Sequence, residues 1–114
     1  RIRESISRQF RDVLVEGEVS NCKLYPSGHL YFTLKDPSSA LKAVMFSFAA
    51  RYPRDLVRDG SAIICRGRVD VYEKRGEYQL IVEEIEPKGL GLLQLQFQAL
   101  KEKLEHPATI FIQD

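Results

Sequence analysis

The stretch SGHLYFTLKDPSSALKAVMF, residues 27–46, alternates apolar and polar side chains before it reaches a turn. Side chains on a strand point to opposite faces in turn, so the two alternating sets are expected to separate into a core face and a solvent face. The apolar set consists of Leu30, Phe32 and Leu34. The other set is aromatic and basic, and it consists of His29, Tyr31, Thr33 and Lys35. A solvent face of this composition is suited to contact with a ligand.

The charge of the chain is nearly balanced overall but not locally. The 114 residues suffice for one compact domain, and 17 Lys and Arg against 16 Asp and Glu leave a formal net charge of +1. This total indicates neither a nucleic-acid nor a membrane partner. Residues 21–78, however, hold ten basic and six acidic side chains. The middle of the chain is therefore its basic part.

Strands are predicted wherever the apolar residues recur with a period of two. They cover residues 13–22, 29–35, 41–46, 62–72 and 78–85, and a helix is predicted over residues 48–57. Gly17 and Gly67 lie in the middle of long strands, where glycine often marks the corner of a closed barrel. Five strands with a helix between the third and the fourth are typical of the OB-fold, an all-β Greek-key barrel. A β-sandwich is the alternative, and the two glycines favour the barrel.

The predicted OB-fold domain covers residues 13–88, with a helix on either side. The apolar residues at the start recur every four positions, which predicts a lead-in helix within residues 1–12. Residues 89–114 are predicted to hold a helix, Leu92–Leu104, and a linker toward a further domain. A first residue other than Met is expected of a piece of a longer protein. No apolar run reaches the length of a membrane span or a signal segment, so we expect a cytoplasmic protein without membrane contact.

Two long stretches are similar to a known family. VEGEVSNCKLYPSGHLYFTLKD, residues 15–36, and RGEYQLIVEEIEPKGLG, residues 75–91, resemble the amino-terminal domain of exodeoxyribonuclease VII large subunits, and the resemblance extends over residues 13–104. It implies a single-strand-specific DNA exonuclease with one large and several small subunits, which needs no divalent metal. It also implies that the nuclease chemistry lies in a domain absent here. The last residues, 105–114, depart from the family, and their apolar residues are expected to pair with a strand edge.

Proteins that bind single-stranded nucleic acid combine aromatic faces, on which bases stack, with cations that follow the phosphates. Tyr31 is the first stacking candidate, because the matching residue is an aromatic base-stacking one in the more loosely similar anticodon-binding OB domains of some aminoacyl-tRNA synthetases. The further aromatic candidates are Tyr25, His29, Tyr72 and Tyr78. The candidates for phosphate contact are Lys23, Lys35, Lys42, Arg66, Arg68, Lys74 and Arg75. The alternative interpretation is that these tyrosines fill strands and that the charges form a solvated face or pair with Asp70 or Glu83.

No motif predicts catalysis, a metal or a cofactor in this chain. Cys22 and Cys65 lack the spacing of a zinc or redox site and are expected to be free thiols. His29 has no nucleophile or metal-ligand partner at motif spacing. The acidic residues 83, 84 and 86 lie on one strand and its end, without matching acids elsewhere.

The sequence therefore predicts a non-catalytic domain that captures single-stranded DNA for a nuclease domain outside this chain, with the small subunit as a further partner. Two alternatives remain open. One is a subunit-assembly module that docks through the helix Leu92–Leu104, although the apolar stripe of this helix is expected to be covered within the chain. The other is an RNA-binding OB domain of the anticodon type, which sugar preference would distinguish.

Overall fold

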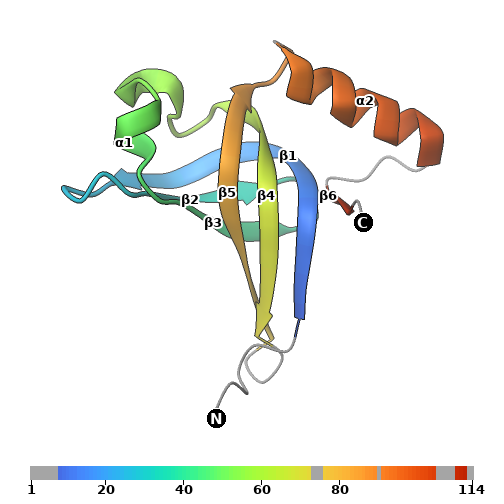
Figure 1. Cartoon of the computed structure of the whole chain (residues 1–114), viewed down its shortest axis with the longest axis horizontal. Helices are drawn as coiled ribbons and strands as arrows, with labels where there is room; N and C mark the ends of the chain where they lie inside the picture. Colours follow the sequence, from blue (N-terminus) through green and yellow to red (C-terminus); the bar gives the residue numbers. More distant parts are fainter. Residues whose placement is uncertain (1–7, 73–75, 90, 105–109, 113–114) are drawn as a thin grey trace.

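The computed structural model describes residues 8–72, 76–89, 91–104 and 110–112. Its main feature is a closed barrel of five strands: β1 (Arg8–Leu24), β2 (Leu30–Lys35), β3 (Ala40–Met45), β4 (Ala62–Tyr72) and β5 (Glu77–Pro87). The barrel closes because β1 pairs with both β2 and β4, while β3 pairs in parallel with β5. The Greek-key OB-fold that the sequence predicts is thus confirmed (Figure 1).

Three helical elements and one further strand accompany the five strands of the barrel. They are the helix α1 (Phe48–Arg51), the 3-10 helix η1 (Arg54–Leu56), the helix α2 (Leu92–Leu104) and the strand β6 (Ile110–Ile112). β6 pairs antiparallel with residues 13–15 of β1, which confirms that the apolar tail pairs with a strand edge. Among the described residues, no helix is both long and apolar enough to cross a membrane.

The alternation in β2 separates core from surface as predicted. Phe32 is 3% exposed and its neighbour Tyr31 is 39% exposed. Leu30 and Leu34 lie in the same core cluster as Phe32, which fills the interior of the barrel. At one end of the barrel this core includes Phe48 of α1, whose ring stacks on Tyr52 at 5.6 Å between centroids.

The two mid-strand glycines lie where strands approach most closely. A Cβ at Gly67 would overlap the carbonyl oxygen of Ile81, at the bulge where the pairing of β4 with β5 shifts register. A Cβ at Gly17 would lie 3.1 Å from the carbonyl oxygen of Lys35 on β2. Gly67 therefore needs a residue without a side chain, whereas a side chain at Gly17 would require β2 to shift slightly. Both close approaches agree with the predicted role of these glycines at the corners of the barrel.

Two predicted helices differ from the structure. The lead-in helix is wrong for residues 8–12, which belong to β1, while residues 1–7 lie outside the described residues. The pairing of residues 8–10 with residues 69–71 of β4 outweighs the helical spacing of a short segment. The helix predicted over residues 48–57 is divided at Pro53 into α1 and η1. Proline disfavours helical backbone in the preceding residue, and Tyr52 is indeed extended.

The helix α2 packs against the outside of the barrel. Its Leu93 and Phe97 are buried in a second cluster with Leu14 of β1 and Ile64 of β4. Its first turn is fixed to β5, because the Leu93 N–H donates to Glu86 Oε1 at 3.0 Å. The expectation that the apolar stripe is covered within the chain is therefore confirmed for these two residues.

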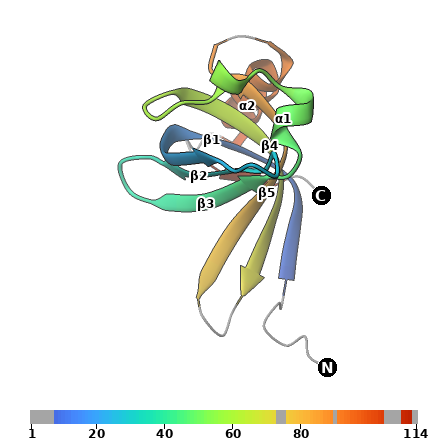
Figure 2. The same ribbon diagram turned by 90° about the vertical axis from the view of Figure 1, so that its left-hand side faces the viewer.

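One end of the sheet extends beyond the barrel. Figures 1 and 2 show the first part of β1, the last part of β4 and the first part of β5 running together away from the other strands, on the side opposite α2. We call this extension the arm. It comprises residues 8–10, 69–72 and 77–80, which are paired with one another. Val69, Val71 and Leu80 of the arm are nevertheless buried and belong to the core cluster.

Candidate nucleic-acid interface

Strand register defines the outward-pointing side of the barrel wall, which we call the outer face; within it Val44 and Ile81 are buried, whereas Tyr31 is exposed. Tyr31 of β2 pairs with Lys23 of β1 on one side and with Val44 of β3 on the other. Val44 pairs with Ile81 of β5, and Ile81 pairs with Arg68 of β4. Directly paired residues share a face of a sheet, so these five side chains form a row across it. In this row, Tyr31 lies between Lys23 and the apolar side chains of Val44 and Ile81.

Four aromatic side chains gather beside this row. Tyr25 and Tyr31 meet edge to face, with ring centroids 5.1 Å apart and planes at 73°. His29 and Phe46 form a second edge-to-face pair at 5.1 Å and 85°. Leu30 and Met45 are paired and both point into the core, so their neighbours His29 and Phe46 point outward. We call these four residues the aromatic cluster.

Backbone hydrogen bonds hold the cluster in place. The turn at residues 25–28 is closed by the Gly28 N–H, which donates to the Tyr25 carbonyl at 2.8 Å, and Gly28 has a φ of 92° that suits glycine. The Ala49 N–H donates to the Gly28 carbonyl and links this turn to α1. The Ser47 N–H donates to His29 Nδ1 at 3.0 Å. The rings are thus attached to a framework of strand, turn and helix.

Three lysines lie on the same outer face as the cluster. Lys23 lies opposite Tyr31, Lys42 lies opposite Thr33 on the outer face, and Lys35 lies opposite Glu18. All three are exposed, and none forms an ion pair within the part of the chain that the structure describes. They are therefore available to phosphate groups.

The two arginines of β4 are differently placed, because each has acidic partners. Arg66 lies 3.4 Å from Glu84 and 4.0 Å from Asp12. Arg68 lies 3.9 Å from Glu83 and 4.0 Å from Asp70, so the acidic partners anticipated for this pair are present. Carboxylates compete with phosphates for a guanidinium group, and we therefore rank these arginines below the three lysines.

The remaining sequence candidates lie on or beyond the arm. Tyr78 is 55% exposed, but it pairs with Val71, which belongs to the core cluster, so it lies on the opposite face of the sheet from Tyr31. Tyr72 is the last residue of β4, and the structure describes only its backbone. Lys74 and Arg75 lie outside the described residues. The structure thus groups six candidates around the outer face: Lys23, Tyr25, His29, Tyr31, Lys35 and Lys42.

Sequence reasoning missed Phe46. Its ring is 49% exposed and contacts His29. The alternation in residues 43–46, AVMF, could have predicted this exposure. Ala43 and Met45 point into the core, so Phe46, which follows Met45, should point outward. An aromatic residue at the end of a predicted strand is more readily interpreted as the edge of the hydrophobic core.

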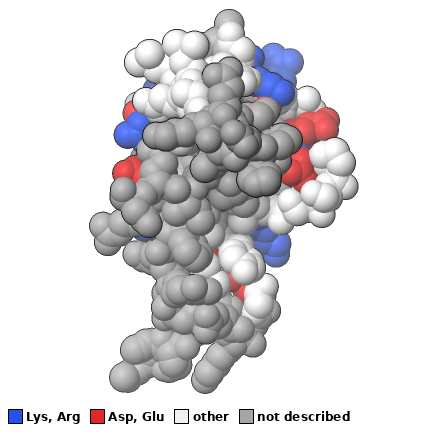
Figure 3. Space-filling model, turned by 90° about the vertical axis from the view of Figure 1, so that its right-hand side faces the viewer, with Lys and Arg blue, Asp and Glu red and all other residues white. Residues whose placement is uncertain are grey.

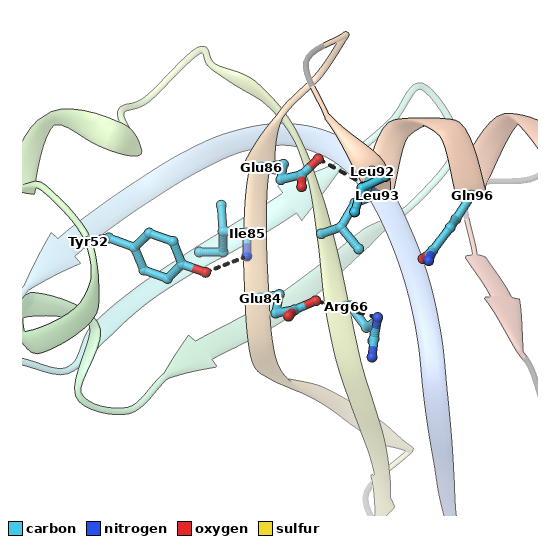
Figure 4. A pocket seen from close by; sticks show the side chains of 8 residues that line it. All are labelled: Tyr52, Arg66, Glu84, Ile85, Glu86, Leu92, Leu93 and Gln96. Atoms are coloured by element: carbon cyan, nitrogen blue, oxygen red, sulfur yellow. Dashed lines mark hydrogen bonds and ion pairs between the residues drawn. The ribbon is translucent and has the colours of Figure 1, made fainter.

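A pocket lies between β4, β5, α2 and Tyr52, the residue that follows α1. It has a volume of about 360 Å³ and is drawn in Figure 4 with its lining residues. Its one arginine, Arg66, is paired with Glu84, and Glu86 accepts the hydrogen bond from α2. On the α2 side of the molecule, the described residues that Figure 3 colours include both basic and acidic groups. This cleft is poorly suited to a polyanion.

We examined the described residues for a metal-binding group and for a reactive thiol. Among them, no group of three or more His, Cys, Asp and Glu side chains is arranged to hold a metal ion. Cys22 and Cys65 are free thiols, half-buried and buried respectively, as expected. Burial raises the pKa of the Cys65 thiol, and burial together with the nearby Asp59 carboxylate raises that of Cys22. Neither thiol is an activated nucleophile.

Comparisons with known proteins agree with this geometry. Residues 1–86 match a family model described as an OB-fold nucleic-acid-binding domain. The exodeoxyribonuclease 7 large subunit of Geobacter metallireducens is 53% identical over 103 residues, which are 90% of this chain and 23% of that protein. The resemblance seen in the sequence is thus confirmed. The chain spans about a quarter of the length of this relative.

Solved structures with the same fold include two nucleic-acid-associated proteins. The asparaginyl-tRNA synthetase of Entamoeba histolytica matches 83% of this chain and 24% of its own, with a TM-score of 0.59 and 16% identity. A replication protein A heterotrimer bound to single-stranded DNA matches 82% of this chain and 73% of its own, with a TM-score of 0.56 and 10% identity. At these identities the likeness concerns the fold alone.

Proposed function

The chain belongs to the family of OB-fold nucleic-acid-binding domains, and from this premise we propose that it captures single-stranded DNA on its outer face. One observation carries the proposal: an aromatic cluster with exposed rings at Tyr31 and Tyr25 shares the outer face with three exposed lysines that form no ion pair with any other described residue. Bases stack on aromatic rings irrespective of sequence, and lysines neutralise the phosphates between them. The domain therefore needs no base-specific hydrogen bonds.

The structure of duplex DNA explains the preference for single strands. In a duplex, each base face is covered by its neighbours, so a protein ring can stack only after a base is unstacked. A single strand offers these faces at a lower cost. We accordingly expect binding to a single strand to exceed binding to a duplex of the same sequence, whereas lysines alone would bind both.

We further propose that the parent protein is the large subunit of a bacterial exodeoxyribonuclease VII, since the relatives carry that name. In this role the domain holds DNA in the cytoplasm for a nuclease domain outside this chain, and it cuts nothing by itself. The name large subunit implies at least one smaller subunit, and we propose that this subunit binds to other parts of the parent protein.

One observation favours a second candidate function, an assembly module. Leu92 and Leu95 of α2 are exposed although Leu93 and Phe97 of the same helix are buried. A helix with apolar residues on both sides can dock a second surface. An RNA-binding role of the anticodon type is also compatible with the fold, and it differs from our proposal in sugar preference.

The test is a titration with fluorescent single-stranded DNA, duplex DNA and single-stranded RNA over a range of salt concentrations. We expect Tyr31→Ala to lose about 1–3 kcal/mol of binding free energy to single-stranded DNA with an unchanged salt slope, because the ring carries no charge. Lys42→Ala should instead reduce the slope of log K against log salt by roughly 0.7, the contribution of one phosphate.

Tyr78→Ala is the matched control, since it removes an exposed tyrosine from the opposite face. It should leave binding unchanged. Equal binding to duplex and single strand would contradict the proposal, and so would an equal loss from Tyr31→Ala and Tyr78→Ala. A preference for RNA would support the anticodon-type alternative instead.

A further inference from the structure

The ring of Phe46 lies on the outer face without an explanation in the fold. Ala43 and Met45 of strand β3 belong to the core, and Phe46 is the first residue beyond this strand. Half of its surface is exposed, more than that of Tyr31. An edge-to-face contact covers one face of only one of the two rings, so the His29–Phe46 pair keeps an open aromatic face.

The residue after Phe46 has an uncommon backbone conformation. Ser47, directly after Phe46, has a φ of 59°, which is uncommon for a residue with a side chain. Its N–H donates to His29 Nδ1 at 3.0 Å, so one imidazole both holds this backbone and contacts the Phe46 ring. Residues in this conformation persist where their surroundings enforce it, and they cluster at ligand sites.

Register gives the spacing between the two halves of the aromatic cluster. Tyr31 lies directly opposite Val44, and Phe46 follows Val44 by two residues, one position beyond the end of β3. Such diagonal neighbours are separated by about 7–8 Å. Stacked nucleotides in one strand of B-DNA rise by only about 3.4 Å. Bases seated on Tyr31 and Phe46 would therefore be drawn apart.

We infer that Phe46 is a second base-stacking position, held by His29, so that the outer face separates two bases of one strand. The inference rests on the proposed function and deepens it. The ligand is an extended single strand, because neighbouring bases must lose their mutual stacking to occupy both rings. A duplex cannot meet this spacing without melting. Tyr31 and Phe46 contact bases, whereas His29 is a positioning residue.

The experiment measures the affinity of the 114-residue chain for a fluorescent thymidine oligonucleotide. Phe46→Ala should weaken binding by roughly 5-fold to 150-fold, the range for one stacked base. Phe46→Leu keeps an apolar side chain against His29 but lacks an aromatic face, and it should weaken binding similarly. Thermal melting of each variant establishes that the fold is retained, and Tyr78→Ala is the control for loss of an exposed ring.

Double variants decide between two positions and one. If each ring holds its own base, Tyr31→Ala with Phe46→Ala should lose the product of the two separate losses. If one base lies between the two rings, the double variant will be no weaker than either single one, and the inference is overturned. His29→Ala should weaken binding in the native background but have no effect beside Phe46→Ala; an equal effect in both backgrounds would overturn its positioning role.

The outcomes for the two proposals are distinct. Loss of binding in Tyr31→Ala with none in Phe46→Ala and Phe46→Leu would overturn the second position and leave the proposed function intact. A native chain that fails to bind the oligonucleotide would overturn both.

Discussion

Tyr31 and Phe32 are neighbours in the sequence, yet one ring faces solvent and the other fills the core. The period of two in β2 fixes this difference, so the sequence alone predicted it correctly. The same rule applied to residues 43–46 would have predicted an outward Phe46. Asp70 and Glu83 were named from the sequence as possible partners of the two arginines of β4, and both lie beside Arg68. The partners of Arg66, Asp12 and Glu84, were not named, because they depend on the bulges that shift β1 and β5 against β4. Alternation predicts the face of a residue but not its ion pairs.

Gly67 provides a test at the scale of one residue. Gly67→Ala should lower the free energy of unfolding by about 1–3 kcal/mol or more, because the added Cβ overlaps the backbone of Ile81. Gly17→Ala should cost less, since its nearest contact is 3.1 Å and a small shift of β2 can relieve it. Chemical denaturation of both variants measures the difference. A smaller loss for Gly67→Ala than for Gly17→Ala would show that the bulge is not the tight point of the barrel.

At the scale of elements, the sequence predicted those whose period extends over many residues. The bounds of β4 and α2 agree with the prediction to the residue, because each has a long and regular pattern. The predicted start of β1 was wrong because the strand structure of residues 8–10 comes from pairing with β4, about sixty residues away in the sequence. The division of α1 from η1 was missed although Pro53 was visible. Long-range pairing is absent from any local pattern.

The helix α2 carries a prediction that separates packing from docking. Phe97→Ala should destabilise the domain by about 3–5 kcal/mol, because it leaves a cavity between α2 and the barrel. Leu95→Ala should change stability by less than about 0.5 kcal/mol, since its side chain is exposed. Thermal melting measures both effects. If neither variant alters stability, α2 does not contribute to the fold in solution, and the assembly role gains weight.

At the scale of the whole molecule, the fold assigns different tasks to different surfaces. The outer face of β1, β2 and β3 has exposed rings and lysines that form no ion pair within the described part of the chain, whereas the face under α2 has paired charges and a buried apolar contact. Net charge did not reveal this division, because acidic residues on β5 and near both ends of the sequence balance the basic ones in the total. The local excess over residues 21–78 indicated it only in part, since it counts arginines that prove to be paired.

The central claim is that a single strand lies on the outer face, and mapping of backbone amide shifts by NMR tests it most directly. On titration of the labelled chain with a thymidine oligonucleotide, we expect the largest shift changes in residues 23–31 and 42–47 and little change in residues 92–97. The amide of Ser47 should be among the most affected, because it is bonded to His29. Shift changes concentrated on α2 and the adjacent cleft, with the aromatic cluster unaffected, would contradict the account.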